Sequence, residues 1–292
     1  MHSRHLHARH LHSRHLLLAL FAALPMGAFA ESDSPWLPIP GKLSLGLNHT
    51  EQSGSDAYIG STLLPLTAIT GGAASKYQRS STTLRVDYGF SDALALDATI
   101  GRAKVKVGAA DNDSGSTDTT LGLRWRVLDE YENPSVPTLT LRAGAIFKGG
   151  YEGARLASIG KGTNGFEVAV VLGKQLTPAV AVWGELGVQD RSGNVPNANF
   201  FELGTRLRFA PQWNASVGYG NKKFGGNLEI GGPGFSPARF QEVREERSVL
   251  KLGVGYAFAA NQGVALNLSK ATAGHNTVKD NQVIGLSYAF AF

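Results

Sequence analysis

The chain has 292 residues, of which 42% are hydrophobic and 17% are charged, and it contains no cysteine. The lack of cysteine excludes a disulfide framework, a cysteine-based metal site and a lipid-anchored lipoprotein. The formal charge of +5 belongs largely to the N-terminus, because Arg4, Arg9 and Arg14 precede the first acidic residue, Glu31. Taking these three from 28 basic residues leaves 25 against 23 acidic ones. A nearly balanced chain without a basic helix argues against a nucleic-acid partner.

Residues 1–30 have the pattern of a cleaved export signal. A basic stretch through Arg14 is followed by the apolar run LLLALFAA and by Ala28-Phe29-Ala30, small at both positions that a signal peptidase reads. The apolar run is too short to span a bilayer as a helix, which needs about 20 residues. We therefore expect the mature chain to begin at Glu31. The six histidines of the repeat HSRHL, HARHL, HSRHL leave with this segment, so we predict no metal site there.

Regular alternation of large and small residues begins near Lys42 and continues to the C-terminus. In the final segment, NQVIGLSYAFAF, large apolar residues alternate with small ones. A period of two predicts a strand with lipid on one side and a crowded interior on the other. The terminal Phe292 resembles the signal by which bacterial outer-membrane proteins are recognised, so we expect the insertion machinery of that membrane as a partner.

The same alternation recurs in about twelve segments, joined by connectors that are alternately short and long. This pattern predicts an all-β transmembrane antiparallel up-and-down barrel of about twelve strands in residues 42–292, preceded by a periplasmic segment in residues 31–41. Ten strands is the alternative, because the first segment carries the pattern only weakly. The predicted strands are Lys42 to Ser53, Arg79 to Phe90, Ala93 to Val107, Asp118 to Leu128, Pro137 to Lys148, Gly165 to Gln175, Ala179 to Gln189, Phe200 to Ala210, Trp213 to Asn221, Glu246 to Phe258, Gly263 to Thr272 and Asp280 to Phe292.

Aromatic residues give an independent test of this topology. Short turns should lie in the periplasm and long loops outside, and amphipathic rings favour the headgroup level. A soluble β-sandwich also alternates, but it would not need aromatics sorted by strand end. At the predicted periplasmic ends lie Tyr88, Phe90, Trp125, Phe209, Trp213, Tyr256, Phe258, Tyr288, Phe290 and Phe292, and the sparser outer girdle would be Phe147, Phe166, Phe201 and Tyr219.

The face opposite the apolar residues carries charges of both signs. An Arg or Lys on the lipid face at mid-membrane would cost about 2–4 kcal/mol, so this parity places the charges in the lumen. There they form either a wet, mixed-charge channel or a network of ion pairs that plugs the barrel. The inward glycines leave room for a passage or relieve curvature. The predicted pore-lining residues are Arg85, Asp87, Asp97, Arg124, Arg126, Arg142, Glu167, Glu185, Glu202, Arg206, Arg208 and Lys251.

Three cations of the third predicted strand, Arg102, Lys104 and Lys106, share the outward parity of Leu96 and Ile100. Because about 9 to 11 residues cross a bilayer, these cations should project above it, where lipopolysaccharide phosphates would attract them. A solvated strand extension, or a bulge that reverses the parity, is the alternative.

The first long outer connector contains an apolar run, Ile59 to Ile69 (IGSTLLPLTAI). It would fold inward as a constriction, form a landing site for an apolar solute, or pack on neighbouring loops.

The two histidines of the mature chain, His49 and His275, are the candidates for catalysis, because some barrels are lipid hydrolases with His and Ser on the outer rim. His49 is followed by Thr50 and Glu51 instead of a Ser at two-residue spacing. We therefore predict no catalytic residue, no metal and no cofactor. The sequence GKGT at Gly160 lacks the spacing of a phosphate-binding loop.

Three stretches resemble a known family: TTLGLRWRVLDE, the loop GKGTNG leading into FEVAVVLGKQL, and VAVWGELG. They resemble outer-membrane barrels linked with the meta-pathway of phenol degradation, over Thr119 to Phe292. The resemblance implies a protein of the Gram-negative outer membrane that helps small organic compounds across, in contact with outer-membrane lipid and lipopolysaccharide, and no catalytic residue carries over. We expect passive passage of small solutes, apolar or aromatic. Recognition through the outer loops, a structural barrel and, less favoured, lipid hydrolysis are the alternatives.

Overall fold

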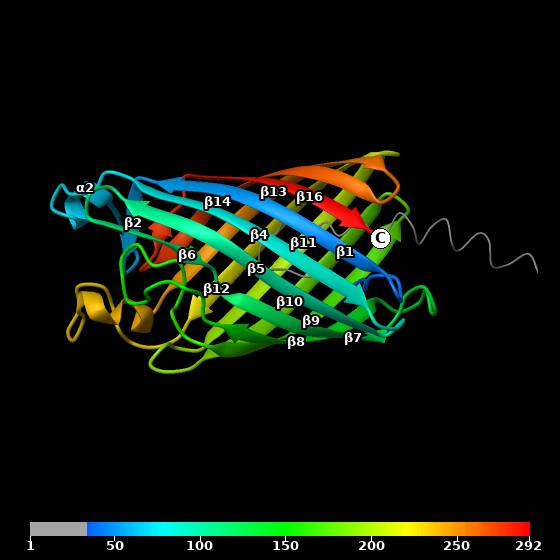
Figure 1. The fold of residues 1–292 in the computed structure, drawn as a ribbon, viewed down its shortest axis with the longest axis horizontal. Coiled ribbons are helices and arrows are strands. Elements are labelled where there is room, and N and C mark those ends of the chain that lie inside the picture. Colours follow the sequence, from blue (N-terminus) through cyan, green and yellow to red (C-terminus); the bar gives the residue numbers. More distant parts are fainter. Residues whose placement is uncertain (1–33) are drawn as a thin grey trace, which may run out of the picture.

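Twelve antiparallel strands close into a barrel in the computed structural model, which describes residues 34–292 (Figure 1). Residues 1–30, the predicted export signal, lie outside the described residues. Each strand pairs with the next along the chain, and β1 pairs with β16 from Ser44↔Ala291 to Ser53↔Gln282, which closes the cylinder. The barrel strands are β1 (Leu43–Gly54), β4 (Tyr77–Gly89), β5 (Leu94–Val107), β7 (Thr119–Leu128), β8 (Thr138–Phe147), β9 (Gly165–Thr177), β10 (Val180–Arg191), β11 (Ala198–Ala210), β12 (Trp213–Phe224), β13 (Glu246–Ala259), β14 (Gln262–His275) and β16 (Gln282–Ala291).

The twelve-strand prediction is confirmed, including the weakly patterned first strand, which pairs with neighbours on both sides. The observed strands β12 and β14 extend three residues beyond the predicted Asn221 and Thr272. Their ladders continue past the lipid-facing segment, for example at Lys223↔Glu246, where polar residues pair above the membrane. Alternation of apolar residues ends at the membrane edge, so it underestimates the length of strands that continue beyond the membrane.

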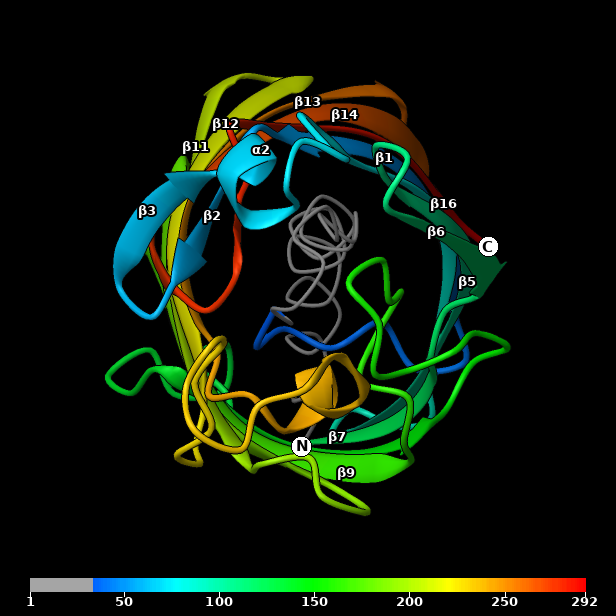
Figure 2. The ribbon, with the colours of Figure 1, turned by 90° about the vertical axis from the view of Figure 1, so that its left-hand side faces the viewer.

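Short elements at the long-loop end have no counterpart among the predicted strands. β2 (Asp56–Ile59), β3 (Thr62–Pro65) and β15 (Val278–Lys279) form a small sheet beside α2 (Leu66–Ile69). β6 (Asp111–Ser116) forms a hairpin with the upper half of β5, and η1 (Pro237–Glu242) lies in the loop before β13. These elements ring the end of the barrel that faces the viewer in Figure 2. Since the short turns and the start of β1 lie at the other end, the end shown is extracellular.

The outer wall is apolar and bordered by aromatic rings. Leu96, Leu123, Leu203 and Leu286 are among many large apolar side chains that are exposed on the outside, as a lipid-facing surface requires. Seven of the ten predicted periplasmic aromatics form ring contacts along the rim: ring centroids are 4.6 Å apart for Trp213 and Tyr256, 6.4 Å for Phe209 and Trp213, 6.4 Å for Phe258 and Tyr288, and 4.5 Å for Phe290 and Phe292. The closed barrel with this belt and girdle places the chain in an outer membrane and excludes a β-sandwich.

Helices contribute little to the described part of the chain. Within residues 34–292, none is long and apolar enough to cross a membrane.

The segment before β1 crosses the lumen at its periplasmic end (Figure 2). Pro35 is fully buried, and its carbonyl accepts a hydrogen bond of 2.6 Å from the Thr140 hydroxyl. The Trp36 indole donates to Glu130, at 2.8 Å, from inside the barrel mouth. Residues 34–41 therefore lie partly inside the barrel, where they help to fill the periplasmic half of the lumen.

The position of the membrane can be tested on β11, where Leu203 is 58% exposed on the lipid face and Asn199 lies on the same face nearer the extracellular end. Leu203→Arg should lower the free energy of unfolding by about 2–4 kcal/mol, because a charge at mid-membrane lacks water. Asn199→Arg should change it by less than about 1 kcal/mol. Reversible urea unfolding in lipid vesicles measures both, and equal costs would contradict this placement of the bilayer.

Candidate functional site

A cavity of about 750 Å³ occupies the extracellular half of the barrel, and we call it the vestibule. Its floor includes Arg85, Asp97, Arg142, Glu185 and Lys251, and its upper wall is formed by outer loops and strand ends. None of residues 34–41 lines it. The vestibule is thus bounded below by charged side chains.

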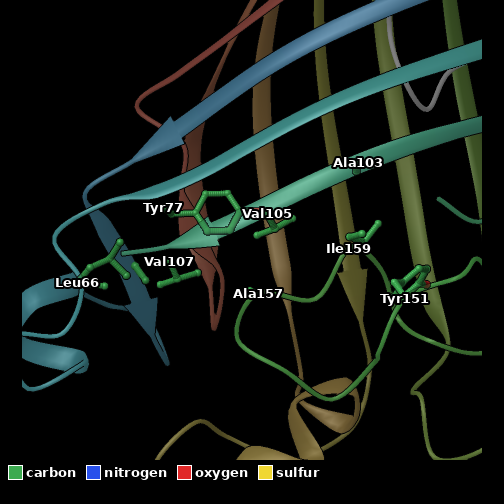
Figure 3. Packing of buried hydrophobic residues seen from close by; sticks show 10 residues of the cluster. Leu66, Tyr77, Ala103, Val105, Val107, Tyr151, Ala157 and Ile159 are labelled. Atoms are coloured by element: carbon green, nitrogen blue, oxygen red, sulfur yellow. The ribbon is translucent and has the colours of Figure 1, made fainter. Parts of the chain in front are cut away.

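One side of the vestibule is apolar (Figure 3). Leu66 of α2 packs in a buried cluster with Tyr77 of β4 and with Val105 and Val107 of β5. The cluster continues to Tyr151 and to residues 157–159 of the loop before β9. The apolar run of the first outer connector therefore packs inward on the barrel and on a neighbouring loop, and Ile59, Leu66 and Ile69 line the cavity.

A second wall combines aromatic rings with cations. The ammonium of Lys222 lies 5.7 Å from the ring centroid of Phe200 and 5.6 Å from that of Phe224. Lys161 lies 4.2 Å from the Phe224 ring, and Arg142 lies 6.0 Å from the Phe200 ring. All five side chains line the vestibule. Cations over aromatic faces are stabilised by the ring quadrupole, and both components remain able to contact a solute.

Lys222 differs from most of the other cations in the vestibule. Within the part of the chain that the structure describes, it has no carboxylate partner. Arg79, on the opposite side, donates to the Ile159 carbonyl at 2.9 Å and likewise has no carboxylate partner among residues 34–292. These two side chains supply positive charge that no carboxylate of residues 34–292 compensates.

The charged floor begins with a buried cluster on β4, β5 and β7. Asp87 and Asp97 lie directly opposite each other in the ladder, which would be unfavourable for two carboxylates alone. Arg85 lies 2.9 Å from Asp87 and 3.6 Å from Asp97, and Arg124 lies 2.5 Å from Asp87 and 3.4 Å from Asp97. Two guanidinium groups thus compensate two carboxylates from both sides.

The floor continues across β8 to β13 through two further groups. Arg142 forms ion pairs with Glu167 and, at 2.7 Å, with Glu185. Lys251 binds Glu202 at 2.5 Å across the two glycines of β12 that separate them. Glu185 and Glu202 are again direct cross-strand neighbours, and each has its own cation. We call the nine side chains of these three groups the charged ring; its members are Arg85, Asp87, Asp97, Arg124, Arg142, Glu167, Glu185, Glu202 and Lys251.

Neutral side chains complete the circumference on β14, β16 and β1. Asn267 donates to Ser287 at 3.2 Å, and Ser287 donates to Asn48 at 2.9 Å. Asn48 in turn donates to Thr50 at 3.0 Å. The lumen at this level is therefore charged along β4 to β13 and neutral but hydrogen-bonded elsewhere.

Three of the twelve predicted pore-lining residues lie nearer the periplasmic end than the charged ring. Arg126 pairs with Asp129 of the following turn at 3.0 Å and donates to the Asp92 carbonyl. Arg206 lies with its guanidinium 5.8 Å from the Trp36 ring, and Arg208 follows two residues further toward the periplasm. The parity of the sequence does not distinguish depth, because successive inward positions of one strand lie at different levels.

At the level of the charged ring and nearer the periplasm, inward glycines leave space that neighbouring side chains occupy. A Cβ at Gly122 would lie 2.6 Å from the Asp97 carboxylate, and one at Gly204 would overlap the Trp183 indole. A Cβ at Gly173 would overlap Pro35 of the N-terminal segment. At these three positions the missing side chain makes room for packing, and does not open a passage.

The outward cations Arg102, Lys104 and Lys106 are exposed on the outer face of β5. The β4–β5 ladder runs without a register shift from Tyr77↔Val107 to Gly89↔Ala95, so the alternative of a bulge that reverses their parity is wrong.

The two mature histidines are engaged in different places. His49 faces outward on β1 and contacts Thr82 at 2.9 Å and Glu51 at 3.2 Å. His275, at the end of β14, contacts Glu229 at 2.7 Å and Ser61 at 3.0 Å, which joins three outer loops.

The contacts from Ser61 to His275 and from His275 to Glu229 resemble those of a hydrolase. The hydrogen-bond donors around them are, however, already engaged within the loops. The Gly60 amide donates to Asn276, and the Asn276 amide donates to Glu229 and to the Arg244 carbonyl. We therefore interpret Ser61, His275 and Glu229 as a clasp between loops. Among residues 34–292, no group of three His, Cys, Asp or Glu side chains could hold a metal ion.

Removal of one buried cation tests the charged ring. Arg124→Gln leaves Asp87 and Asp97 facing each other with Arg85 alone, and should lower the free energy of unfolding by about 3–5 kcal/mol. Arg102→Gln, which changes an exposed cation on the outer face of β5, should change it by about 0.5 kcal/mol or less. Denaturant unfolding in lipid vesicles measures both variants. Similar costs would show that the ring does not stabilise the barrel.

The loop clasp should depend on pH through Glu229. Burial by itself raises the pKa of the Glu229 carboxyl, but hydrogen bonds with Asn276 and His275 outweigh this and, together with Arg244, hold the pKa below its usual value. A lowered folded-state pKa means that the carboxylate stabilises the clasp above about pH 4.3 and that this contribution is lost as the pH falls through the folded value.

A spin label on Thr62→Cys, in a chain without other cysteines, reports the clasp. Its mobility should increase between pH 7 and pH 3, whereas Glu229→Gln should be mobile at both. A label on Ser192→Cys, in a loop without Glu229, is the control. A label on residue 62 that does not respond to pH would refute the clasp.

The sequence matches a known protein family, and the fold is similar to solved outer-membrane barrels. The model of a family described as "Putative MetA-pathway of phenol degradation" matches residues 43–288. A search of curated sequences finds no match. An outer membrane channel from Pseudomonas putida F1 is similar in structure, with 19% identity, a TM-score of 0.67, and coverage of 88% of this chain and 97% of that one. The NanC porin has 9% identity, a TM-score of 0.54, and coverage of 84% and 98%. The family match spans most of the chain, and the protein belongs to this phenol-degradation family of outer-membrane barrels.

Proposed function

We propose that the barrel gives passive passage to small solutes, and that it favours aromatic compounds carrying a negative charge. The observation that carries the proposal is the vestibule wall of Phe200, Phe224 and Lys222, in which a cation lies beside two aromatic rings and has no carboxylate partner among residues 34–292. A solute ring would pack on the phenyl groups while its carboxylate or phenolate meets the ammonium. The family's link with phenol degradation agrees with this role, and the structurally similar protein from Pseudomonas putida is an outer membrane channel.

The charge of the vestibule favours anions as a whole. Nine cations line it against six carboxylates, and three of these cations pair with Asp87, Asp111 and Asp280 just outside the lining. Among residues 34–292, Arg79 and Lys222 therefore carry the charge that no carboxylate compensates. Positive walls raise the local concentration of anions, and this focusing weakens with ionic strength. The cations are Arg79, Arg85, Arg142, Arg155, Lys161, Arg191, Lys222, Arg247 and Lys251, and the carboxylates are Asp97, Asp118, Glu167, Glu185, Glu202 and Glu245.

Transit then requires passage beyond the charged ring and the N-terminal segment. The ring binds most of its charges to one another, so it opposes a solute by its packing more than by its net field. Residues 34–41 are held in the periplasmic mouth by hydrogen bonds of Pro35 and Trp36, and displacement of this segment would open that part of the route.

The proposed partners follow from the outer surface and from the alternating strand β16. Outer-membrane lipid covers the apolar belt, and the insertion machinery would recognise the alternation of large and small residues in β16. The role we propose is selection by binding and size, without catalysis, since the Gly60 amide and the Asn276 side chain beside Ser61 serve the loop clasp.

Permeation into liposomes tests the proposal with benzoate and benzyl alcohol, which differ in charge but share a ring. Lys222→Met should lower benzoate flux severalfold, on the order of 3-fold to 10-fold, and leave benzyl alcohol flux nearly unchanged. Lys223→Met is the matched control, since the next residue points outward and pairs with Glu246. Equal benzoate flux in Lys222→Met and the unsubstituted protein would overturn the preference for anions.

Planar-bilayer conductance tests whether the barrel passes solutes at all, independently of its preference for anions. Deletion of residues 34–41 should raise the single-channel conductance, because it empties the periplasmic mouth. If neither the full mature chain nor the deletion variant conducts ions or passes benzyl alcohol, passive passage is refuted.

A further inference from the structure

The outer wall carries a row of cations, none of which lines the vestibule. Arg102, Lys104 and Lys106 occupy consecutive outward positions of β5 and are all exposed. At about 3.4 Å per residue, neighbouring members of the row lie about 7 Å apart along the strand. Within residues 34–292 none of them has a carboxylate partner.

Polar, uncharged side chains flank this row on both sides. Arg102 lies across from Thr82 of β4 and Ser116 of β6. Lys104 lies across from Ser80 and Ser114 in the same way. A cleft of about 280 Å³ lies among these residues, lined by Ser80, Ser81, Thr82, Arg102, Ala103, Lys104, Ser114 and Gly115. Hydroxyl donors beside cations are the chemistry that binds phosphate oxygens.

Two of the three acidic residues of this region point to the opposite face, and the third, Glu51, lies on the outer face two strands away from Lys104. Asp111 and Asp113 of β6 occupy the opposite parity from Ser114, and Asp111 pairs with Arg155. Glu51 of β1 lies across from Ser80, and its carboxylate contacts His49. The strand β6 thus adds hydroxyl groups to the outer face without adding negative charge to it.

The row stands directly above the lipid-facing surface. Leu96 and Ile100 lie on the same face of the same strand and are about half exposed. Ile100 is followed on that face by Arg102, so acyl chains packed on the apolar residues would place their headgroups level with the cations.

From this arrangement we propose that the outer face of β4, β5 and β6 binds the phosphate groups of lipopolysaccharide. The acyl chains contact Leu96 and Ile100, the phosphates meet Arg102 and Lys104 in the cleft, and Lys106 contacts the more distal sugar-phosphate region. Continuity with the lipid belt favours a phosphorylated lipid over free phosphate as the occupant.

The test compares lipopolysaccharide bound per protein after purification in a mild detergent, measured by native mass spectrometry. The triple variant R102Q/K104Q/K106Q should retain on the order of tenfold less, because each cation at an anionic surface contributes measurably to binding. The double variant K223Q/K270Q is the matched control, since both lysines are exposed on the outer face of other strands. Circular dichroism and urea unfolding confirm that each variant folds.

Two further arms separate the sources of phosphate. Purified protein is stripped of lipid and mixed with lipopolysaccharide, with lipid A lacking its phosphates, or with inorganic phosphate. Binding that requires the phosphates and the acyl chains supports the proposal. Equal retention by the triple variant and the unsubstituted protein, equal loss in the control, or binding of inorganic phosphate alone would overturn it.

Discussion

The exclusion of charge from lipid is the constraint on which the rest of this structure depends. A strand of period two has only two faces, so every side chain that lipid rejects must enter a narrow lumen. Cross-strand register then brings like charges together, as at Asp87↔Asp97, Arg124↔Arg142 and Glu185↔Glu202. At each of these sites, an oppositely charged side chain from an adjacent position compensates the like charges. The charged ring is therefore a consequence of crowding as much as a device of selection.

The ring divides the lumen into two regions with different contents. Above it, loops supply apolar and aromatic side chains, and the cavity holds an excess of cations. Below it, Trp183, Pro35 and Trp36 fill space that inward glycines leave, so that the periplasmic half is packed. A solute would thus be bound first and admitted afterwards. Specificity can reside in the vestibule, while the rate of transit depends on the ring and on the segment before β1.

Alternation in the sequence predicted the strands and the direction of their side chains, because both follow from a local period. It could not predict at which level of the barrel each inward side chain lies, or which residues that side chain contacts. Arg124 and Arg126 have the same parity, yet one is buried between two aspartates and the other binds a periplasmic turn. Gly204 resembles an opening in the sequence, but the Trp183 indole fills it. The hairpin strand β6 carries no such signal, because its residues, DNDSGS, pair above the membrane and have no apolar face.

Two adjacent residues of β12 show how different the inner and outer faces of the barrel wall are. Lys222 points into the vestibule between two phenyl rings, and Lys223 points outward toward Glu246. Only the register of β12 distinguishes them, since Lys222 pairs with Phe200 and Lys223 with Asn199. A slip of one residue would exchange their environments and would turn Phe224 outward. The lipid belt forbids that slip, because it would also bring Gly218 and Gly220 to the outer face in place of Val217 and Tyr219. The membrane therefore fixes the chemistry of the vestibule from the other side of the same strand.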